Sequence, residues 1–250
     1  MSVFRFKQFD ITNVRSAMKV NTDGVLLGAA VGLSYLQEEE NWQVLDVGTG
    51  TGTIALMLAQ RLTQKSGFRE LHLTGIDIDK ASAEEAAENF SKSPWAEHLE
   101  AHNLDLCRFG AEMPDKVFDL IVSNPPYFDC SLKAPEERRN AARHTDSLSY
   151  KELMDFSLVH LKEGGRLAVI LPSDVEKTLL RYGRMCSLFP VRILRIQTTP
   201  KKQPARIIVE FIKGSKDLEA TMQEELLTLQ EGGQYTAEYT RLVHEFYLWA

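Results

Sequence analysis

The chain has 250 residues, of which 44% are hydrophobic and 26% charged, a balance typical of an ordinary globular protein with one α/β domain. No apolar run reaches the ~18 residues of a membrane helix and no signal peptide opens the chain, so we expect a cytoplasmic protein without a membrane partner. Three scattered cysteines predict reduced thiols and no metal site, and nothing indicates an obligate protein partner. The net charge of −6, taken alone, argues against nucleic-acid binding.

Apolar strand-like runs alternate with helix-like segments, which predicts a largely parallel sheet covered by helices on both faces. Short strands near Phe4 and Ile11 precede a helix that begins near Gly24. The following elements are predicted in this order: strand Trp42–Val47, helix Thr53–Leu62, strand Leu71–Ile78, helix Ala81–Phe90, strand Phe118–Ser123, helix Lys151–Leu161, and strands Arg166–Leu171, Val191–Thr198 and Arg206–Lys213. The last two strands lack a crossover helix between them, so we expect them to pair antiparallel at one edge.

A glycine loop, Asp46-Val47-Gly48-Thr49-Gly50-Thr51-Gly52, follows the first long strand and opens a helix. Its glycines let the backbone turn sharply and approach a ligand, and the helix N-terminus suits a carboxylate or phosphate. A dinucleotide fingerprint would need its third glycine at Thr53, which disfavours a nicotinamide oxidoreductase. An acid before the first glycine suits an ammonium group, and S-adenosylmethionine carries both an amino-acid end and a sulfonium.

A second motif, Asn124-Pro125-Pro126-Tyr127, follows the strand Phe118–Ser123. Consecutive prolines fix the backbone and remove two donors, which leaves carbonyl oxygens facing outward as acceptors. Asn124 adds a side-chain acceptor, and Tyr127 offers a ring on which a flat group can stack. Two rigid acceptors suit the two hydrogens of an –NH2 group. Asn124, Pro125, Pro126 and Tyr127 are therefore the predicted catalytic residues of methyl transfer to an amine nitrogen.

Together the two motifs resemble the class I amino-methyltransferases. The resemblance implies a Rossmann-like, mostly parallel seven-stranded sheet, with S-adenosylmethionine as cofactor and S-adenosylhomocysteine as product. In that family the acid ending the second strand holds the ribose hydroxyls, a position matched by Asp77. A further acid after the third strand usually meets the adenine amine, a position matched by Asp105. A helix cap is the alternative for Asp105. The implied cofactor site comprises Asp46, Gly48, Gly50, Gly52, Asp77, Asp105 and Asn124.

The flanking segments resemble the bacterial tRNA1(Val) adenine-N6-methyltransferases, which modify the adenosine at position 37, just 3′ of the anticodon. The matching segments are residues 4–9, 17–28, 123–128, 142–144 and 246–248, and the resemblance covers nearly the whole chain. It implies a single domain, 1–250, in which residues 1–40 form an N-terminal extension that contributes to the cofactor pocket and 41–250 form the catalytic core. It also places Lys19 and Thr22 beside the cofactor, although Thr22-Asp23-Gly24 reads equally well as a helix cap.

Basic residues are concentrated late in the chain, where residues 181–213 hold eight bases against one acid. Such segregation suggests one polyanion-facing region on an otherwise acidic body, and a solvated face that contacts nothing is the alternative. With the family resemblance, tRNA is the expected partner. The residues expected to contact its phosphates are Arg138, Arg139, Arg143, Lys201, Lys202 and Arg206.

Three other functions remain open at this point. A glutamine-N5-methyltransferase of release factors uses the same tetrapeptide, but such enzymes carry a helical N-terminal domain, which the short segment before Trp42 does not resemble. A guanine-N2 ribosomal RNA methyltransferase usually has Phe where Tyr127 stands. An inactive, RNA-binding methyltransferase fold is disfavoured by the intact glycine loop and by Asn124.

Overall fold

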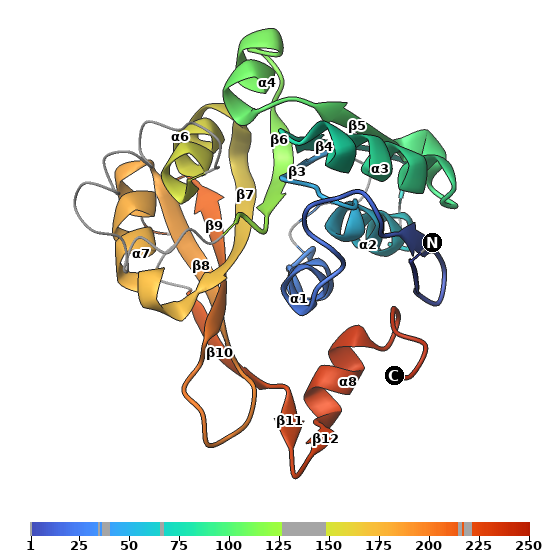
Figure 1. Cartoon of the computed structure of the whole chain (residues 1–250). Helices are drawn as coiled ribbons and strands as arrows, with labels where there is room; N and C mark the ends of the chain where they lie inside the picture. The colour runs from blue at the N-terminus through green and yellow to red at the C-terminus, as the bar shows by residue number, and fades with distance from the viewer. Residues whose placement is uncertain are drawn as a thin grey trace, which may run out of the picture.

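The computed structural model describes residues 2–34, 36, 41–65, 68–126, 149–214, 217 and 222–250. In these residues the central feature is an eight-stranded sheet with the spatial order β10-β8-β9-β7-β6-β3-β4-β5 (Figure 1). Its strands are β3 (Asn41–Val47), β4 (Glu70–Asp77), β5 (Leu99–Asn103), β6 (Phe118–Ser123), β7 (Leu161–Pro172), β8 (Leu188–Gln197), β9 (Arg206–Lys213) and β10 (Gln223–Thr228). The mostly parallel α/β fold is confirmed, and the sheet has one strand more than the seven expected.

Strand pairing explains the extra strand. The run from β5 through β4, β3 and β6 to β7 is parallel. β9 lies antiparallel between β7 and β8, and β10 pairs in parallel with β8. The antiparallel pairing of β8 with β9 is therefore confirmed, but their expected position at the edge is wrong, because β10 forms the edge. β10 is mostly exposed and rich in polar residues, so it lacks the apolar run that marks a buried strand.

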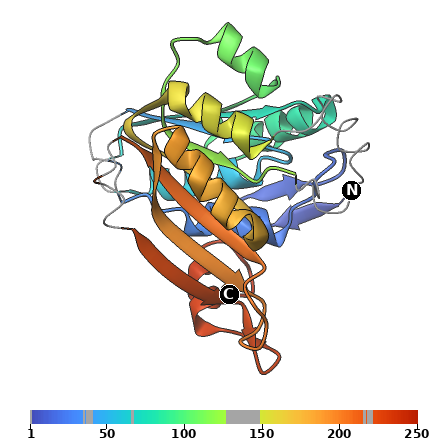
Figure 2. The same ribbon diagram turned by 90° about the vertical axis from the view of Figure 1, so that its left-hand side faces the viewer.

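Helices cover both faces of the sheet (Figures 1 and 2). They are α1 (Thr22–Ala30), α2 (Thr53–Thr63), α3 (Lys80–Ser91), α4 (Leu106–Glu112), α6 (Tyr150–His160), α7 (Glu176–Met185) and α8 (Ala237–Val243), with short 3-10 helices η1 (Ala96–His98) and η2 (Ser173–Val175). Helices α1, α2, α3 and α8 contribute to one buried core, and α4, α6 and α7 to the other. Side chains alternate along a strand, so the neighbouring residues Val44 and Leu45 pack into the cores on opposite faces of the sheet. No helix in the described part of the chain is long and apolar enough to cross a membrane.

The two ends of the chain pack against each other. Two antiparallel hairpins lie in these end segments: β1 (Val3–Arg5) with β2 (Asp10–Thr12), and β11 (Gln230–Glu231) with β12 (Gln234–Tyr235). Phe6 forms a β-bridge with Tyr247, and their rings stack at a centroid distance of 5.8 Å. The backbone N–H of Lys7 donates to the Phe246 carbonyl at 2.8 Å. These contacts fix the N-terminal hairpin beside the last helix.

Helix α1 is anchored to the sheet at both of its ends. In its first turn, Asp23 forms an ion pair with Arg206 of β9, with 2.9 Å between Nε and Oδ2. At its last turn, Nη1 of Arg192 on β8 donates to the Ala30 carbonyl at 2.6 Å. Helix α1 thus packs on the sheet, and the single domain expected for residues 1–250 stays a prediction.

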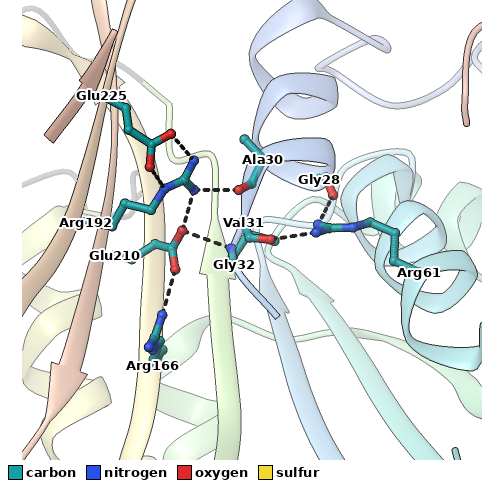
Figure 3. Close-up of polar contacts among 9 residues, drawn as sticks. All are labelled: Gly28, Ala30, Val31, Gly32, Arg61, Arg166, Arg192, Glu210 and Glu225. Carbon is teal, nitrogen blue, oxygen red and sulfur yellow. Dashed lines mark hydrogen bonds and ion pairs between the residues drawn. The ribbon is translucent and has the colours of Figure 1, made fainter. Parts of the chain in front are cut away.

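A charged network surrounds the C-terminal end of α1 (Figure 3). Glu210 of β9 is completely buried and accepts hydrogen bonds from Arg192 Nη1 at 2.8 Å, Arg166 Nη1 at 3.2 Å and the Gly32 N–H at 2.9 Å. Arg192 also donates two hydrogen bonds to Glu225 of β10, at 2.8 and 3.0 Å. The network therefore joins β7, β8, β9 and β10 to Ala30, the last residue of α1, and to Gly32, two residues beyond it.

Arg61 of α2 reaches the same helix end from the other side (Figure 3). Its Nη1 donates to the Gly28 carbonyl and its Nη2 to the Val31 carbonyl, both at 2.8 Å. The last carbonyl groups of a helix have no partner within the helix, and the negative end of the helix dipole favours cations there. Two arginines, Arg61 and Arg192, therefore donate to three carbonyl groups at the end of α1, those of Gly28, Ala30 and Val31.

Candidate functional site

The glycine loop joins β3 to α2 at the carboxyl edge of the parallel strands. Gly48, Gly50 and Gly52 have φ angles of 71°, 57° and 79°, a region that favours glycine. A Cβ on Gly52 would lie 2.4 Å from the ring of Phe90, whereas nothing among the described residues lies within 4 Å of a Cβ built on Gly48. All three positions therefore favour glycine because of their positive φ angles, and Gly52 also has no room for a side chain. Around Gly48 there is space that a ligand could occupy.

Asp46 of β3 is completely buried behind this loop. Its Oδ2 accepts from the Thr49 hydroxyl at 2.8 Å, while Oδ1 has no hydrogen-bond partner among the described residues. Burial raises the pKa of this carboxyl to about 7, opposed by the Thr49 hydroxyl and, at longer range, by the Ala55 N–H. A buried carboxylate oxygen without a partner is unfavourable. The site therefore suits a cationic ligand group that completes the hydrogen bonding of Asp46.

Asp77 ends β4 and connects it to the glycine loop. Its Oδ2 accepts from the Gly50 N–H at 2.8 Å, and its Oδ1 accepts from the Asp79 N–H at 2.9 Å. Burial raises the pKa of Asp77 above its ordinary value, although these two N–H groups oppose the rise. Each carboxylate oxygen can accept a second hydrogen bond. Asp77 can therefore hold the loop and still accept from the hydroxyl groups of a ligand.

Asp105 caps α4, because its Oδ1 accepts from the Arg108 N–H at 2.8 Å. The capping alternative is thus correct, and a ligand contact of the half-buried Asp105 stays a prediction. Nearby, the Nδ2 of Asn103 donates to the carbonyl oxygens of Asp77 at 3.0 Å and Ile78 at 2.8 Å. Asn103 ties the end of β5 to the end of β4, a role that sequence reasoning missed.

The two motifs meet because β3 and β6 are neighbours in the sheet. Val47 pairs with Ser123 in parallel register, and the Ser123 hydroxyl donates to the Val47 carbonyl at 2.8 Å. The glycine loop and Asn124 each begin directly after these paired residues, so they lie side by side. In open α/β sheets ligands bind at this carboxyl edge of the strands.

Asn124 is 7% exposed and contacts the N-terminal segment. Its Nδ2 lies 3.7 Å from the Sδ of Met18, within hydrogen-bonding range of sulfur. Pro125 is buried and Pro126 is exposed. Tyr127 lies outside the described residues, so its predicted stacking role stays a prediction. The structure thus places the first three residues of the motif at the edge of the glycine loop.

A buried carboxylate on α3, Glu85, holds the N-terminal segment in place. It accepts hydrogen bonds from three consecutive N–H groups, those of Val14 and Arg15 at 2.8 Å and that of Ser16 at 2.9 Å. Burial alone would raise the pKa of Glu85, but these three bonds hold it below its usual range. The Ser16 hydroxyl then donates to the Met18 carbonyl at 3.0 Å. Glu85 therefore fixes the turn that carries Met18 to Asn124.

Asn89 of α3 joins the same segment to the glycine loop. Its Oδ1 accepts from the Thr12 N–H at 2.8 Å, and its Nδ2 donates to the carbonyl oxygens of Thr12 at 3.0 Å and Thr51 at 2.9 Å. Sequence reasoning missed both Glu85 and Asn89. In the sequence, Ser82, Glu85 and Asn89 form only a polar stripe on one face of the helix, and their burial is visible only in the structure.

Lys19 and Thr22 lie on the surface after this turn. Lys19 is exposed, and its Nζ donates to the Val14 carbonyl at 2.5 Å. Thr22 is the exposed first residue of α1, and the cap of that helix is Asn21, whose Oδ1 accepts from the Gly24 N–H at 2.8 Å. The helix start at this stretch is therefore confirmed with Asn21 as its cap, and the cofactor contacts of Lys19 and Thr22 stay predictions.

The basic segment 181–213 is partly neutralised within the fold. Four of its bases, Arg192, Arg195, Arg206 and Lys213, form ion pairs with the acids Glu210 and Glu225, Glu176 and Glu224, Asp23, and Glu163. Lys201 and Lys202 are exposed in the turn between β8 and β9. That turn lies at the carboxyl edge of the parallel strands, because Arg206 pairs with Pro172 at the end of β7. The other expected phosphate contacts, Arg138, Arg139 and Arg143, lie outside the described residues.

Comparison with known sequences identifies close relatives. A family model described as the methyltransferase small domain matches residues 21–181. A Bacteroides thetaiotaomicron protein named tRNA1(Val) (adenine(37)-N6)-methyltransferase is 39% identical over 245 residues, which cover 98% of this chain and 97% of that protein. A protein of the same name from Parabacteroides distasonis is 41% identical over 248 residues, covering 98% of this chain and 97% of that protein.

Solved structures share the fold. A predicted O-methyltransferase from Agrobacterium tumefaciens superposes with a TM-score of 0.64 at 19% identity, covering 90% of this chain and 96% of that one. The 16S rRNA N2 G1207 methyltransferase of Thermus thermophilus, solved with AdoMet and guanosine, gives a TM-score of 0.53 at 19% identity, covering 85% of this chain and 50% of that one. At such identities the likeness concerns the fold alone.

Proposed function

The chain belongs to the tRNA1(Val) (adenine(37)-N6)-methyltransferase family, and we propose that it transfers a methyl group from S-adenosylmethionine to the N6 amine of adenosine 37 in tRNA1(Val). The observation that carries this proposal is the position of the buried Asn124 beside the glycine loop, at the paired ends of β6 and β3. A cofactor on the loop and an amine at Asn124 would then lie within transfer distance of each other.

The residues at the ends of β3 and β4 fit S-adenosylmethionine. The glycine loop and the start of α2 offer backbone N–H groups to its carboxylate. The Oδ1 of Asp46, which has no partner among the described residues, would accept a hydrogen bond from its ammonium group, and Asp77 would accept from its ribose hydroxyls. Asp105, Lys19 and Thr22 are further proposed contacts. When bound, the cofactor supplies an electrophilic methyl group.

Asn124 orients the substrate amine in this mechanism. Its Oδ1 and a backbone carbonyl of the Asn124–Pro126 turn accept the two amine hydrogens, so that the nitrogen lone pair is directed at the methyl carbon. With the cofactor bound, the amine nitrogen would take the methyl group as the C–S bond of the sulfonium breaks, and the surplus amine proton would pass to water. No general base is required, because the contribution of Asn124 is positioning and preorganised electrostatics. Tyr127 would stack on the base.

The tRNA would approach over the carboxyl edge of the sheet. Lys201 and Lys202 are the described residues best placed to contact its phosphates, and Arg138, Arg139 and Arg143 are further proposed contacts. Arg206 is engaged by Asp23, so we assign it chiefly to the position of α1. A base in an anticodon loop is already partly unstacked, so its extrusion costs a few kcal/mol at most. A tRNA substrate also favours a cytoplasmic location.

The function is tested by methyl transfer from labelled S-adenosylmethionine into total tRNA, total rRNA and release-factor protein, followed by nucleoside analysis. Label in tRNA as N6-methyladenosine at position 37 is the expected result. Label in rRNA as N2-methylguanosine would instead indicate a guanine-N2 ribosomal RNA methyltransferase. Label in protein would indicate a glutamine-N5-methyltransferase of release factors. No label in any fraction would favour an inactive, RNA-binding fold.

Asn124→Ala tests the assigned role of the motif. We expect turnover to fall by about 10²-fold or more, the scale for loss of one preorganised contact to the reacting group. Cofactor affinity, measured by calorimetry, should change by less than about threefold, because ground-state binding of the cofactor does not depend on the amine acceptor. An equal loss of both quantities would make Asn124 a structural residue.

A further inference from the structure

The contact between Met18 and Asn124 shows which end of the Asn124 amide faces the N-terminal segment. A thioether sulfur accepts hydrogen bonds and has no donor. The 3.7 Å contact between Met18 Sδ and Asn124 Nδ2 therefore requires the NH2 end of the amide to face Met18. The carbonyl oxygen, Oδ1, is the other arm of the same planar group, so it is directed away from the sulfur.

Met18 is itself held by a hydrogen-bonded turn. The Ser16 hydroxyl donates to the Met18 carbonyl at 3.0 Å, and the Ser16 N–H donates to Glu85 at 2.9 Å. Met18 is 39% exposed, so core packing does not dictate its identity. The same turn approaches the glycine loop, since a Cβ built on Gly50 would lie 3.7 Å from the Met18 carbonyl oxygen. One short segment thus lies against both the loop and Asn124.

We propose that Met18 is a positioning residue of the transfer step, whose thioether turns the Asn124 amide so that Oδ1 faces the substrate amine. The proposal rests on the role given to Asn124 in the proposed function. If the amide were reversed, its NH2 group would meet the amine hydrogens, and the amine would lose an acceptor. Glu85 contributes indirectly to the orientation of Asn124, because it holds the turn that carries Met18.

Two substitutions at Met18 distinguish the effect of its sulfur as a hydrogen-bond acceptor from the effect of its side-chain volume. Met18→Leu keeps the volume and removes the sulfur, and it should lower kcat by about tenfold or more. The KM for tRNA and the Kd for S-adenosylmethionine should both stay within about twofold. Met18→Gln restores an acceptor oxygen, so its kcat should stay within about threefold of the wild type. Met113→Leu is the matched control, because Met113 is similarly exposed and follows α4, away from the motif.

A second readout does not depend on turnover. The side-chain amide signal of Asn124 in the nuclear magnetic resonance spectrum of the cofactor-free protein is identified by its loss in Asn124→Ala. We expect this signal to move in Met18→Leu and to stay in place in Met113→Leu. The proposal is overturned if Met18→Leu leaves the signal unmoved, if it retains wild-type kcat, or if Met18→Gln loses as much activity as Met18→Leu.

Asn124→Ala, assayed alongside, distinguishes this proposal from the proposed function. Full turnover in Asn124→Ala would remove the catalytic role of Asn124 and the role of Met18 with it. A loss of turnover in Asn124→Ala together with normal turnover in Met18→Leu would overturn the role of Met18 alone.

Discussion

A carboxyl group with a pKa of about 7 changes its charge within the physiological pH range, and Asp46 is such a group. Its pKa in the folded protein lies above the ordinary value, so the folded state binds this proton more tightly than the unfolded state does. Asp46 therefore reduces stability progressively as the pH rises from about 4 to about 7. A cationic ligand prefers the carboxylate form, so binding of the cofactor is linked to the release of this proton.

We predict that the affinity for S-adenosylmethionine increases as the pH rises to about 7, because Asp46 becomes charged. Affinity should fall again above about pH 8, where an α-amino group loses its proton. Calorimetric titration across this range measures both effects.

Asp46→Asn should abolish the rise on the acid side. Asp79→Asn is the matched control: the pKa of Asp79 is already lowered by its bonds to Ser82, and Asn caps a helix as well as Asp does. An acid-side rise that persists in Asp46→Asn would remove Asp46 from the ammonium site.

Residues whose chemistry is local could be predicted from the sequence, and those whose partners are distant could not. The glycine loop and Asn124 each follow a recognisable strand and Asp77 ends one, and the structure brings the three together. Glu85 acts on Ser16, 69 positions away, so nothing in its own neighbourhood indicates the contact. The same holds for Asp23, which neutralises Arg206 across 183 positions.

At the scale of elements, α1 depends on buried charge more than on its own sequence. Carbonyl groups at its C-terminal end accept hydrogen bonds from Arg61 and Arg192. Just beyond the helix, the Gly32 N–H donates to Glu210. Removal of one member of a buried ion network leaves the others uncompensated, which is far more costly than loss of an exposed pair. The position of α1 on the sheet therefore depends on residues in β8 and β9.

Glu210→Gln should lower the free energy of unfolding by about 3–5 kcal/mol, because Arg166 and Arg192 would lose their buried carboxylate. Urea denaturation measures the change. Lys80→Ala, which removes only the exposed pair with Glu84, is the control and should cost no more than about 0.5 kcal/mol. A loss below about 1 kcal/mol in Glu210→Gln would show that α1 is held by packing alone.

The buried elements were the predictable ones. The bounds of β6 and β9 agree with the sequence prediction, and those of α2 and α3 differ by a residue at one or both ends. Helix α7 and strand β10 were not predicted. Strand β10 is mostly exposed, so its sequence lacks an apolar run. Helix α7 is amphipathic, so its period was present in the sequence and was missed.

For the whole molecule, the net charge of −6 conceals an uneven arrangement. Half of the bases that appeared to form a polyanion-binding segment are paired within the fold, since their acidic partners come from other elements. Sequence reasoning counted these charges correctly but could not assign their partners. Lys201 and Lys202 are exposed at the carboxyl edge of the sheet, beside the candidate site, and are therefore available to a phosphate backbone.

Lys201→Glu with Lys202→Glu should weaken tRNA binding and flatten its dependence on salt. Each lost phosphate contact removes about 0.7–0.9 from the slope of log K against log salt concentration. Filter binding at several salt concentrations gives the slope. Lys92→Glu with Lys116→Glu makes the same change in charge at the opposite edge of the sheet and should leave the slope unaltered. Equal slopes in the wild type and both double variants would show that Lys201 and Lys202 do not contact the phosphates of the tRNA.

The contact between the two end segments bears on whether the chain tolerates circular permutation. Lys7 donates to the carbonyl oxygens of both Phe246 and Ala250, so the early hairpin and the last residues are already neighbours. A short flexible linker could join them, and new ends could be opened in the exposed turn between Pro114 and Asp115. Such a circular permutant should keep the architecture, because the fold depends on which segments touch and little on the order in which a ribosome makes them.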